Sequence, residues 1–369
     1  MSVTVRALSP TRRNRTRFID LEWEIYRGNP AWVPPLKMDM HAQLNPDKNP
    51  YHEHAETQLF LAERDGKPVG RIAAHVNHNH EAHWHDGVGF FGFFECFDDQ
   101  EAAHALFDAA RTFLREHGRS AIRGPFSWSA NDPIGIQIDQ HHRSPTLMMP
   151  YNPAYYAGLV EGAGLEKAKD LYAYWIHDPG YVPDRLRRGV EISKKRNKIE
   201  VRPFNRKDFW NEAERIKYIY REAWEDNWSS VPITDKEFEH LARDLKQGLD
   251  PRIVYFAYVN DELAGFSLSL PDANQAIKHA NGRLLPFGLL KILWHMRHVQ
   301  HVRVLLLGVL GKFRNHAVDV ALYHETFDVG RRLGYTSAEM SWILEDNYAM
   351  INPLEKFGAQ RDKTYRVYE

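Results

Sequence analysis

The chain has 369 residues, of which 43% are hydrophobic and 12% aromatic, which is enough apolar material for two domain cores. Its 48 basic and 49 acidic residues give a formal charge of −1, so nothing global points to nucleic acid or another polyanion as partner. The single cysteine, Cys96, excludes a disulfide framework and fits a reducing compartment. We expect a soluble, cytoplasmic protein, because no signal segment follows Met1 and no apolar run reaches the ~20 residues of a spanning helix.

The first half of the chain alternates strand and helix patterns. A basic, strand-like segment opens the chain, and a helix is predicted from about Thr16 to Tyr26. The elements predicted after it are strands Gln58–Glu63, Val69–Val76 and Gly89–Phe94, a helix Asp99–His117 and a strand Ala121–Gly124. Asp65-Gly66, between the first two of these strands, is typical of a two-residue hairpin turn.

The second half repeats that order. The predicted elements are strand Ile199–Phe204, helix Asn211–Glu225, and a hairpin of Ile253–Val259 and Leu263–Leu270 about Asn260-Asp261. The hairpins LFLAERDGKPVGRI and FAYVNDELAGFS align so that Gly70 meets Gly265, and each is followed by a strand, a helix and a strand. We interpret this as an internal duplication of an α/β unit, with the units at residues 1–180 and 181–369.

The segment Val302–Leu322, near the C-terminus, predicts an anion-binding site. It begins as an apolar run typical of a buried strand, passes through a turn with Lys312 and Arg314, and becomes a helix that ends at Gly334. Asn315 is the expected N-cap. The free N–H groups and the dipole of such a helix start attract a negative group.

The corresponding turn of the first half has the opposite charge. It places Glu95, Asp98 and Asp99 at the start of the helix and has no basic residue there. Three carboxylates repel a phosphate group. We therefore expect only the second unit to bind the anion, and the first unit to shape the acceptor side.

The segment LGVLGKFRNHAVDVAL resembles the loop that binds the acyl-CoA pyrophosphate in the GNAT acyltransferases, with Phe313 and Arg314 at its start and Ala317-Val318 in place of its Gly-Ile pair. Asp319 departs from the family pattern, because it brings a carboxylate to a phosphate site. Asn347, followed by LEKFG at Leu354–Gly358, is similar to the closing motif of the same family. Together with GFFGFFECFDDQEAA, GPFSWSANDPIG and LPDANQAIKHANGRLLPFG, nearly the whole chain resembles a bacterial family of tandem GNAT proteins that includes bacterial ceramide synthases.

The resemblance implies an α/β fold of two tandem GNAT-like units, with mixed sheets flanked by helices. It implies an N-acyltransferase that moves a long acyl chain from acyl-CoA to the amine of a sphingoid base. The residues implied to bind acyl-CoA are Leu307, Gly308 and Val309 for the pantetheine arm, Arg314, Asn315, His316, Ala317 and Val318 for the pyrophosphate, and Asn347. The tyrosine that often protonates the leaving thiolate in this family falls at Leu354, which leaves the general acid open.

The chemistry requires a base, because the attacking amine must lose a proton. Glu345 is the first candidate and Asp272, in LPDANQ, is the second. The alternative for Glu345 is a helix N-terminal charge beside Asn347. A backbone N–H near Val309 is expected to hold the oxyanion.

Gly124–Tyr156 is a long polar and aromatic segment of the kind that often carries function. Asn131, Asp132, Tyr151 and Tyr155 are the candidates for lining an acceptor pocket, and Tyr156 stands beside them. The alternative is a structural loop held by its own Asx turns.

Two further stretches have an ordinary and a functional interpretation. The basic segment Arg185–Lys198 is either a solvated connector or a surface for the 3′-phosphate of CoA or an anionic membrane. The histidines of His52–His85 include pairs at ligand spacing, but they lie in a predicted loop without cysteine, and we expect no metal.

Arg283–His298 is the most apolar stretch outside the strands, and Leu289, Ile292, Leu293 and Met296 share a helix face. It is predicted to pack in the core or in a homodimer. The alternatives are a wall for a long acyl chain and an interfacial helix on a bilayer, which would place the protein peripherally at the inner membrane.

Two rival functions stay open. Asp319 and Leu354 favour a non-catalytic binding protein that keeps the GNAT frame. An acetyltransferase acting on a small soluble amine is the other, and the apolar Arg283–His298 segment argues against it.

Overall fold

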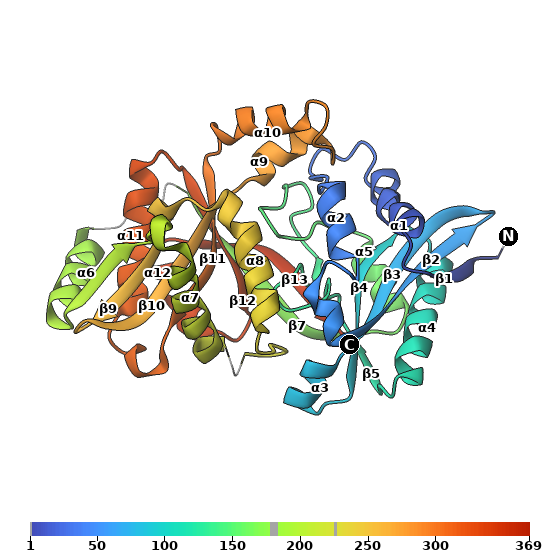
Figure 1. Ribbon diagram of the computed structural model, residues 1–369, viewed down its shortest axis with the longest axis horizontal. Helices are drawn as coiled ribbons and strands as arrows, with labels where there is room; N and C mark the ends of the chain where they lie inside the picture. The colour runs from blue at the N-terminus through green and yellow to red at the C-terminus, as the bar shows by residue number, and fades with distance from the viewer. Residues whose placement is uncertain (1, 178–183, 225–226) are drawn as a thin grey trace. The chain divides into compact units, whose positions relative to one another are not determined.

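The structure is a computed structural model that describes residues 2–177, 184–224 and 227–369. It divides into two compact units (Figure 1). Unit 1 comprises Met1–Leu171, Asn274–His295 and Lys363–Glu369, and unit 2 comprises Tyr172–Ala273 and Met296–Asp362. The boundary expected between the two repeats, at residues 180 and 181, lies outside the described residues, as does Glu225 at the end of a predicted helix.

Unit 1 contains a mixed sheet with the strand order β1-β2-β3-β4-β5. Its elements are β1 (Thr4–Leu8), α1 (Arg12–Ile25), α2 (Lys37–Gln43), β2 (Ala55–Arg64), β3 (Lys67–Asn77), α3 (His78–Trp84), β4 (Val88–Cys96), α4 (Gln100–Glu116), β5 (Ala121–Arg123), β6 (Ile136–Gln137) and α5 (Tyr156–Gly162). It also holds α9 (Asn274–Ile277), most of α10 (Gly288–Met296) and the C-terminal part of β13 (Gln360–Tyr368), which pairs with β6. Only β4 and β5 run parallel in the five-stranded sheet of the described residues.

Helix α4 forms in unit 1 because its apolar residues repeat at helical spacing and Asp99 caps its start. Its buried face packs on β2 and β3 in one core with α5. Helix α1 contacts β3 and β4 in a second core that includes Trp128. The sheet is therefore covered by helices on both faces.

Unit 2 contains the strands β7-β12-β11-β10-β9-β8 in that spatial order. Its elements are α6 (Asp184–Arg196), β8 (Ile199–Pro203), α7 (Phe209–Trp224), α8 (Asp235–Gly248), β9 (Val254–Val259), β10 (Glu262–Pro271), β11 (His301–Val309), α11 (Val318–Arg332), β12 (Ser337–Leu344) and α12 (Tyr348–Lys356). The boundary between the units falls within β7 (Lys167–His177) and within β13. Helix α11 packs on β9, β10 and β11, and α7 packs on β10 and β11.

The same order of elements recurs in both units, as the duplication predicts. The hairpin turns Asp65-Gly66 and Asn260-Asp261 both have positive φ at both residues, which is the two-residue turn that suits a hairpin. The register shifts just before Gly70 in β3 and just before Gly265 in β10, so the aligned glycines follow equivalent bulges. A Cβ on Gly265 would lie 2.7 Å from the Gly308 carbonyl oxygen, so this position needs glycine.

Two predictions about local structure are wrong. The histidines of His78–Trp84 form helix α3, although a loop was expected, because Asn77 caps the helix. Helix α11 starts at Val318 and not after Asn315, because Ala317 takes a left-handed conformation (φ 59°) at the N-cap. In Arg283–His298 the side chains of Leu289 and Leu293 are exposed, which argues against packing in the core and leaves the other interpretations of this segment open.

The end of α11 agrees with the prediction. Gly334 has φ 90°, and Tyr335 N donates to Gly330 O at 3.0 Å, which closes the helix in the way that a glycine permits. None of the described helices has the length and apolar character to cross a bilayer.

Candidate functional site

Strands β11 and β12 separate partway along their length. In the described part of the chain their parallel pairing runs from His301 opposite Ser337 to Val304 opposite Met340 and then stops, although β11 continues to Val309. The other edge of β11 stays paired with β10 as far as Val309. The peptide groups of β11 that face β12 beyond Val304 are therefore open to a ligand. The expected pantetheine residues Leu307, Gly308 and Val309 all lie on this stretch.

The predicted anion loop follows directly. Phe313 is buried and anchors the loop, and the His316 ring packs edge-on against it at 5.7 Å. Ala317, the N-cap of α11, has no side chain able to accept from the first turn. The N-cap side chain therefore takes none of the N–H groups of the first turn.

The two loop cations differ in their partners. Lys312 pairs with Glu262. Arg314 is exposed and has no ion-pair partner among the residues that the structure describes, and Asn315 beside it is exposed as well. Arg314 is therefore the cation that can bind a phosphate.

Asp319 lies in the first turn of α11. Burial raises the pKa of its carboxyl group, while hydrogen bonds from the backbone N–H groups of Val320 and of Asp319 itself act in the opposite direction. The carboxylate thus uses the N–H groups to which an anion would bind. The departure from the family pattern places a competing negative charge at the helix start.

Helix α6 brings basic residues to the same loop. It packs on α11, Lys194 lies 3.8 Å from Glu325 of α11, and Asn197 Nδ2 donates to His316 O at 2.8 Å. The C-terminal end of α6, with Lys195 and Arg196 exposed, therefore lies beside the loop. This contact favours the functional interpretation of the basic segment.

The two base candidates lie at opposite ends of the sheet. Asp272 is buried after β10, and its N–H donates to His301 O at 2.8 Å, level with the start of β12. Glu345 is half-buried and follows the last residue of β12. Eight strand residues separate the two levels, which is on the order of 25 Å. They cannot serve one reaction centre together.

Asn347 has a structural role. Its side chain accepts from Met350 N at 3.3 Å and caps α12. Leu354, at the position of the family's tyrosine, is fully buried in the unit 2 core. No acid stands at that position.

A buried network of three polar side chains, which the sequence did not lead us to predict, lies where β11 and β12 begin to separate. Ser341 Oγ donates to Glu339 Oε1 at 2.8 Å and accepts from Arg303 Nε at 3.1 Å. Ala338 and Met340 belong to the core on the α11 side, so Glu339 projects from the opposite face. The sequence does contain a signal for this network, because each of the apolar strands VRVLLLG and SAEMSWIL includes one charged residue, Arg303 or Glu339.

The proposed acceptor residues lie in unit 1, and their polar atoms contact unit 1. Asp132 accepts from the backbone and hydroxyl of Ser129 at 3.0 and 2.8 Å, and Asn131 N donates to Ser129 Oγ at 3.1 Å. Tyr151 OH donates to His141 O, and Tyr155 OH donates to Cys96 O at 3.0 Å. The bond from Asn131 N to Ser129 Oγ closes a serine turn, which is a structural role, and the acceptor role of the four residues stays a proposal.

The first unit's counterpart of the anion loop is closed. Asp99 accepts from Ala102 N at 3.1 Å and pairs with Arg64, so the start of α4 already holds a carboxylate. The chain after β5 stays bonded to β4 through Phe126 N and Phe91 O at 2.7 Å. In this unit the two strands do not leave an open edge of the kind seen in unit 2.

Glu95 precedes that turn at the end of β4 and is largely buried, with its side chain 13% exposed. Tyr26 and Tyr156 donate to its carboxylate at 2.8 and 2.6 Å. Burial and the charge of Glu22 raise the pKa of Glu95 to about 8. Glu95 therefore joins a buried network and does not line a phosphate site.

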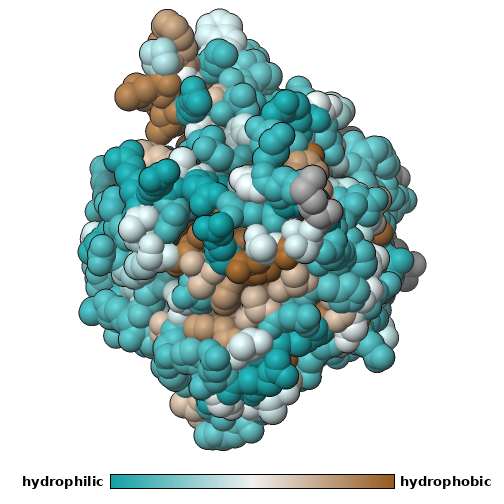
Figure 2. Space-filling view, turned by 90° about the vertical axis from the view of Figure 1, so that its right-hand side faces the viewer, coloured by the Kyte–Doolittle hydropathy of each residue, from teal (hydrophilic) through white to brown (hydrophobic). Residues whose placement is uncertain are grey.

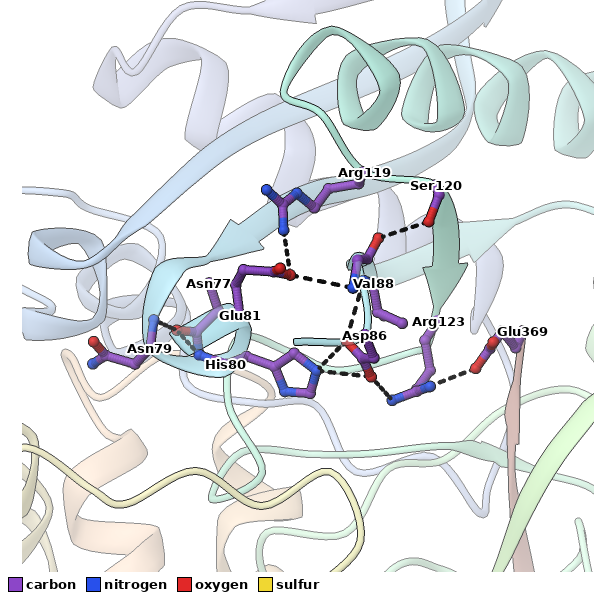
Figure 3. Close-up of polar contacts among 11 residues, drawn as sticks. Asn77, Asn79, His80, Glu81, Asp86, Val88, Arg119, Ser120, Arg123 and Glu369 are labelled. Atoms are coloured by element: carbon purple, nitrogen blue, oxygen red, sulfur yellow. Dashed lines mark hydrogen bonds and ion pairs between the residues drawn. The ribbon is translucent and has the colours of Figure 1, made fainter. Parts of the chain in front are cut away.

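The histidine-rich stretch builds structure around α3 (Figure 3). His80 is buried and its Nε2 lies 3.1 Å from Asp86, which also pairs with Arg123. Arg123 in turn pairs with Glu369 at 2.7 Å. Among the described residues no group of three or more His, Cys, Asp and Glu side chains is arranged to hold a metal ion.

No protein-family model matches the sequence. The chain is 36% identical over 364 residues to the bacterial ceramide synthase of Caulobacter vibrioides, covering 96% of this chain and 94% of that protein. It is 34% identical over 360 residues to protein YghO of Escherichia coli, covering 95% and 91% of the two chains.

Two solved structures share the fold. A tandem GNAT protein from the clavulanic acid biosynthesis pathway superposes with a TM-score of 0.59 at 13% identity, over 100% of this chain and 98% of that one. A GCN5-related N-acetyltransferase from Sphaerobacter thermophilus gives 0.52 at 13% identity, over 99% and 94%.

Proposed function

We propose that this chain, which belongs to the family of tandem GNAT proteins that includes the bacterial ceramide synthase, transfers a long acyl chain from acyl-CoA to the amine of a sphingoid base. The acyltransferase class follows from the family and the fold. The observation in this chain that supports the proposal is the separation of β11 from β12, directly before a helix, α11, whose N-cap residue makes no side-chain hydrogen bond.

Acyl-CoA binds along this path in unit 2. The pantetheine arm pairs with the peptide groups of Leu307–Val309 that β12 leaves unpaired, as a short strand would. The pyrophosphate meets the first turn of α11 and the guanidinium of Arg314. The cations at the C-terminal end of α6 lie close enough to the loop to attract the 3′-phosphate.

The transfer is a direct attack of the neutral amine on the thioester carbonyl. A C–N bond forms, the C–S bond breaks, and the CoA thiolate leaves. A backbone N–H of β11 stabilises the oxyanion, and Glu345 takes the proton that the amine loses. Glu339 is the alternative base, because it is buried at the point where the strands separate and Glu345 lies beyond the strand end.

The first repeat, residues 1–180, serves the acceptor. Its own counterpart of the loop is occupied by Asp99, which supports a single acyl-CoA site in the second repeat, residues 181–369. Asn131, Asp132, Tyr151 and Tyr155 stay candidates for acceptor contacts.

We also propose that the reaction needs no metal, that the protein acts without nucleic acid, and that it forms a homodimer or associates peripherally with the inner membrane.

The test is a transfer assay with purified protein. Palmitoyl-CoA with sphinganine should release free thiol and give an N-acyl product detected by mass spectrometry. Acetyl-CoA with small soluble amines should give far less. Turnover of acetyl-CoA with small amines alone would replace the proposal by the soluble acetyltransferase. No thiol release with any amine, despite acyl-CoA binding, would favour the non-catalytic alternative.

A further inference from the structure

An exposed apolar surface lies on α10 and the turn before it. The α10 patch consists of Leu285, Phe287, Leu289, Leu290, Leu293 and Trp294. These six are half of the exposed large hydrophobic side chains in the described part of the chain, and Leu285 is 79% exposed. Helix α10 forms the top of Figure 1, and hydrophobic residues project at the top of Figure 2. Apolar side chains gathered in this way mark an interaction surface.

The base of this segment is firmly held in unit 1. Trp23 Nε1 donates to Asn281 Oδ1 at 3.2 Å, and Lys37 N donates to Gly282 O at 3.0 Å. Asn274 Nδ2 donates to Pro145 O and Thr146 O at 3.0 and 2.9 Å. The α10 patch is therefore exposed on a segment that is held in place, because the residues before α10 are hydrogen-bonded to α1, α2 and the loop after β6.

The segment that carries the patch is basic. No Asp or Glu stands between Asp272 and Asp319 in the sequence, and Lys278, Arg283 and Lys291 are all exposed. On the neighbouring helix α1, Asp20 pairs with Lys37 and Glu24 pairs with Arg27. Asp39 of α2 is the exposed acidic residue on the helix that holds Gly282, so the segment itself is basic and the helix beside it carries one carboxylate.

A second copy of the chain is a poor occupant for this surface. In a symmetric dimer the same patch faces itself, which would bring Arg283 and Lys291 of both copies together. An anionic bilayer matches both properties, since its acyl region takes up the apolar side chains and its headgroups attract the cations. Tryptophan at the edge of such a helix suits the interface.

We propose that the α10 patch, together with Lys278, Arg283 and Lys291, docks the protein on the surface of an anionic phospholipid bilayer. The helix lies in the interface and does not span it. This inference stands on the surface of unit 1 and does not depend on the acyl-transfer reaction.

Vesicle co-sedimentation tests it. The full chain is mixed with vesicles of phosphatidylcholine alone or of phosphatidylcholine with phosphatidylglycerol. The wild type should sediment with the anionic vesicles and weakly with the neutral ones. Leu290→Glu should lower the partition coefficient about tenfold or more. Lys291→Glu should lower it about fivefold or more on the anionic vesicles only.

Tyr218→Glu is the matched control, because it changes another exposed aromatic side chain, on α7, and should partition as the wild type does. Thiol release from a short-chain acyl-CoA, measured without vesicles, reports separately on the proposed reaction. Wild-type protein that stays in the supernatant, or variants that sediment as it does, would overturn the proposal. So would a dimer that Leu290→Glu turns into monomer with unchanged vesicle binding.

Discussion

Arg303 lies directly opposite Glu339 in the parallel register of β11 and β12, and both side chains are buried. Ser341 accepts from the guanidinium and donates to the carboxylate, so the three side chains form one network. A buried charge needs its partner, because the sheet core cannot solvate it. The network therefore ties the two strands together immediately before they separate.

Arg303→Met should lower the free energy of unfolding by about 3–5 kcal/mol, because it leaves the Glu339 carboxylate buried without its cation. Urea unfolding followed by tryptophan fluorescence measures this. The double variant Arg303→Met with Glu339→Leu should recover most of the loss. A loss below about 1 kcal/mol for the single variant would show that the pair does not act as a buried ion pair.

Glu345→Gln should lower kcat about a hundredfold while the Kd for CoA stays within a factor of about two, because a general base contributes to the chemical step and not to CoA binding. The transfer assay together with calorimetry separates the two effects. Glu339→Gln is the matched comparison. If Glu345→Gln turns over like the wild type and Glu339→Gln does not, the base is Glu339.

Arg314→Ala should weaken CoA binding by about tenfold or more, because a charge-assisted contact to phosphate is worth about 1.5–3 kcal/mol. Lys312→Ala should change the Kd little, since Lys312 already pairs with Glu262. Isothermal titration with CoA compares the two. Equal losses would mean that the loop attracts the ligand through its total charge and not through one positioned cation.

Asp319→Asn should tighten CoA binding about fivefold to tenfold near pH 8, because it removes a negative charge from the first turn of α11. Burial raises the pKa of Asp319, so its protonated form is retained to higher pH than for an exposed aspartate. In the wild type the affinity should therefore rise as the pH falls through that pKa, and the variant should lack this part of the pH dependence. The ratio of the two Kd values across pH checks it, because titration of the CoA phosphates cancels. A ratio that does not change with pH would contradict the prediction.

Local signals predicted the strands and hairpins well. Asp65-Gly66 and Asn260-Asp261 specify their turns by themselves, since few residues accept two successive positive φ angles. Gly334 specifies the end of α11 for the same reason. Features that depend on residues far apart in the sequence were harder to predict from local sequence patterns.

The start of α11 was misplaced, because Ala317 takes a left-handed conformation that its sequence does not signal. The spacing of apolar residues in Arg283–His298 predicted an apolar helix face, but it could not predict whether the core, a second copy or a bilayer covers that face. Glu345 and Asp272 were ranked as alternative bases, and only the parallel register shows that they lie level with opposite ends of β12. The pairing of Arg303 with Glu339 across the two strands was missed, because the register cannot be predicted from either strand alone.

Hydrogen exchange with a non-reactive thioether analogue of palmitoyl-CoA tests whether acyl-CoA binds between β11 and β12 and at the start of α11. The analogue should slow exchange of the Leu305–Val309 and Val318–Leu322 amides and leave the Gln100–Ala103 amides at the start of α4 unchanged. Protection at Gln100–Ala103 instead, or protection in neither place when the analogue is bound, would show that acyl-CoA does not bind at this site in unit 2.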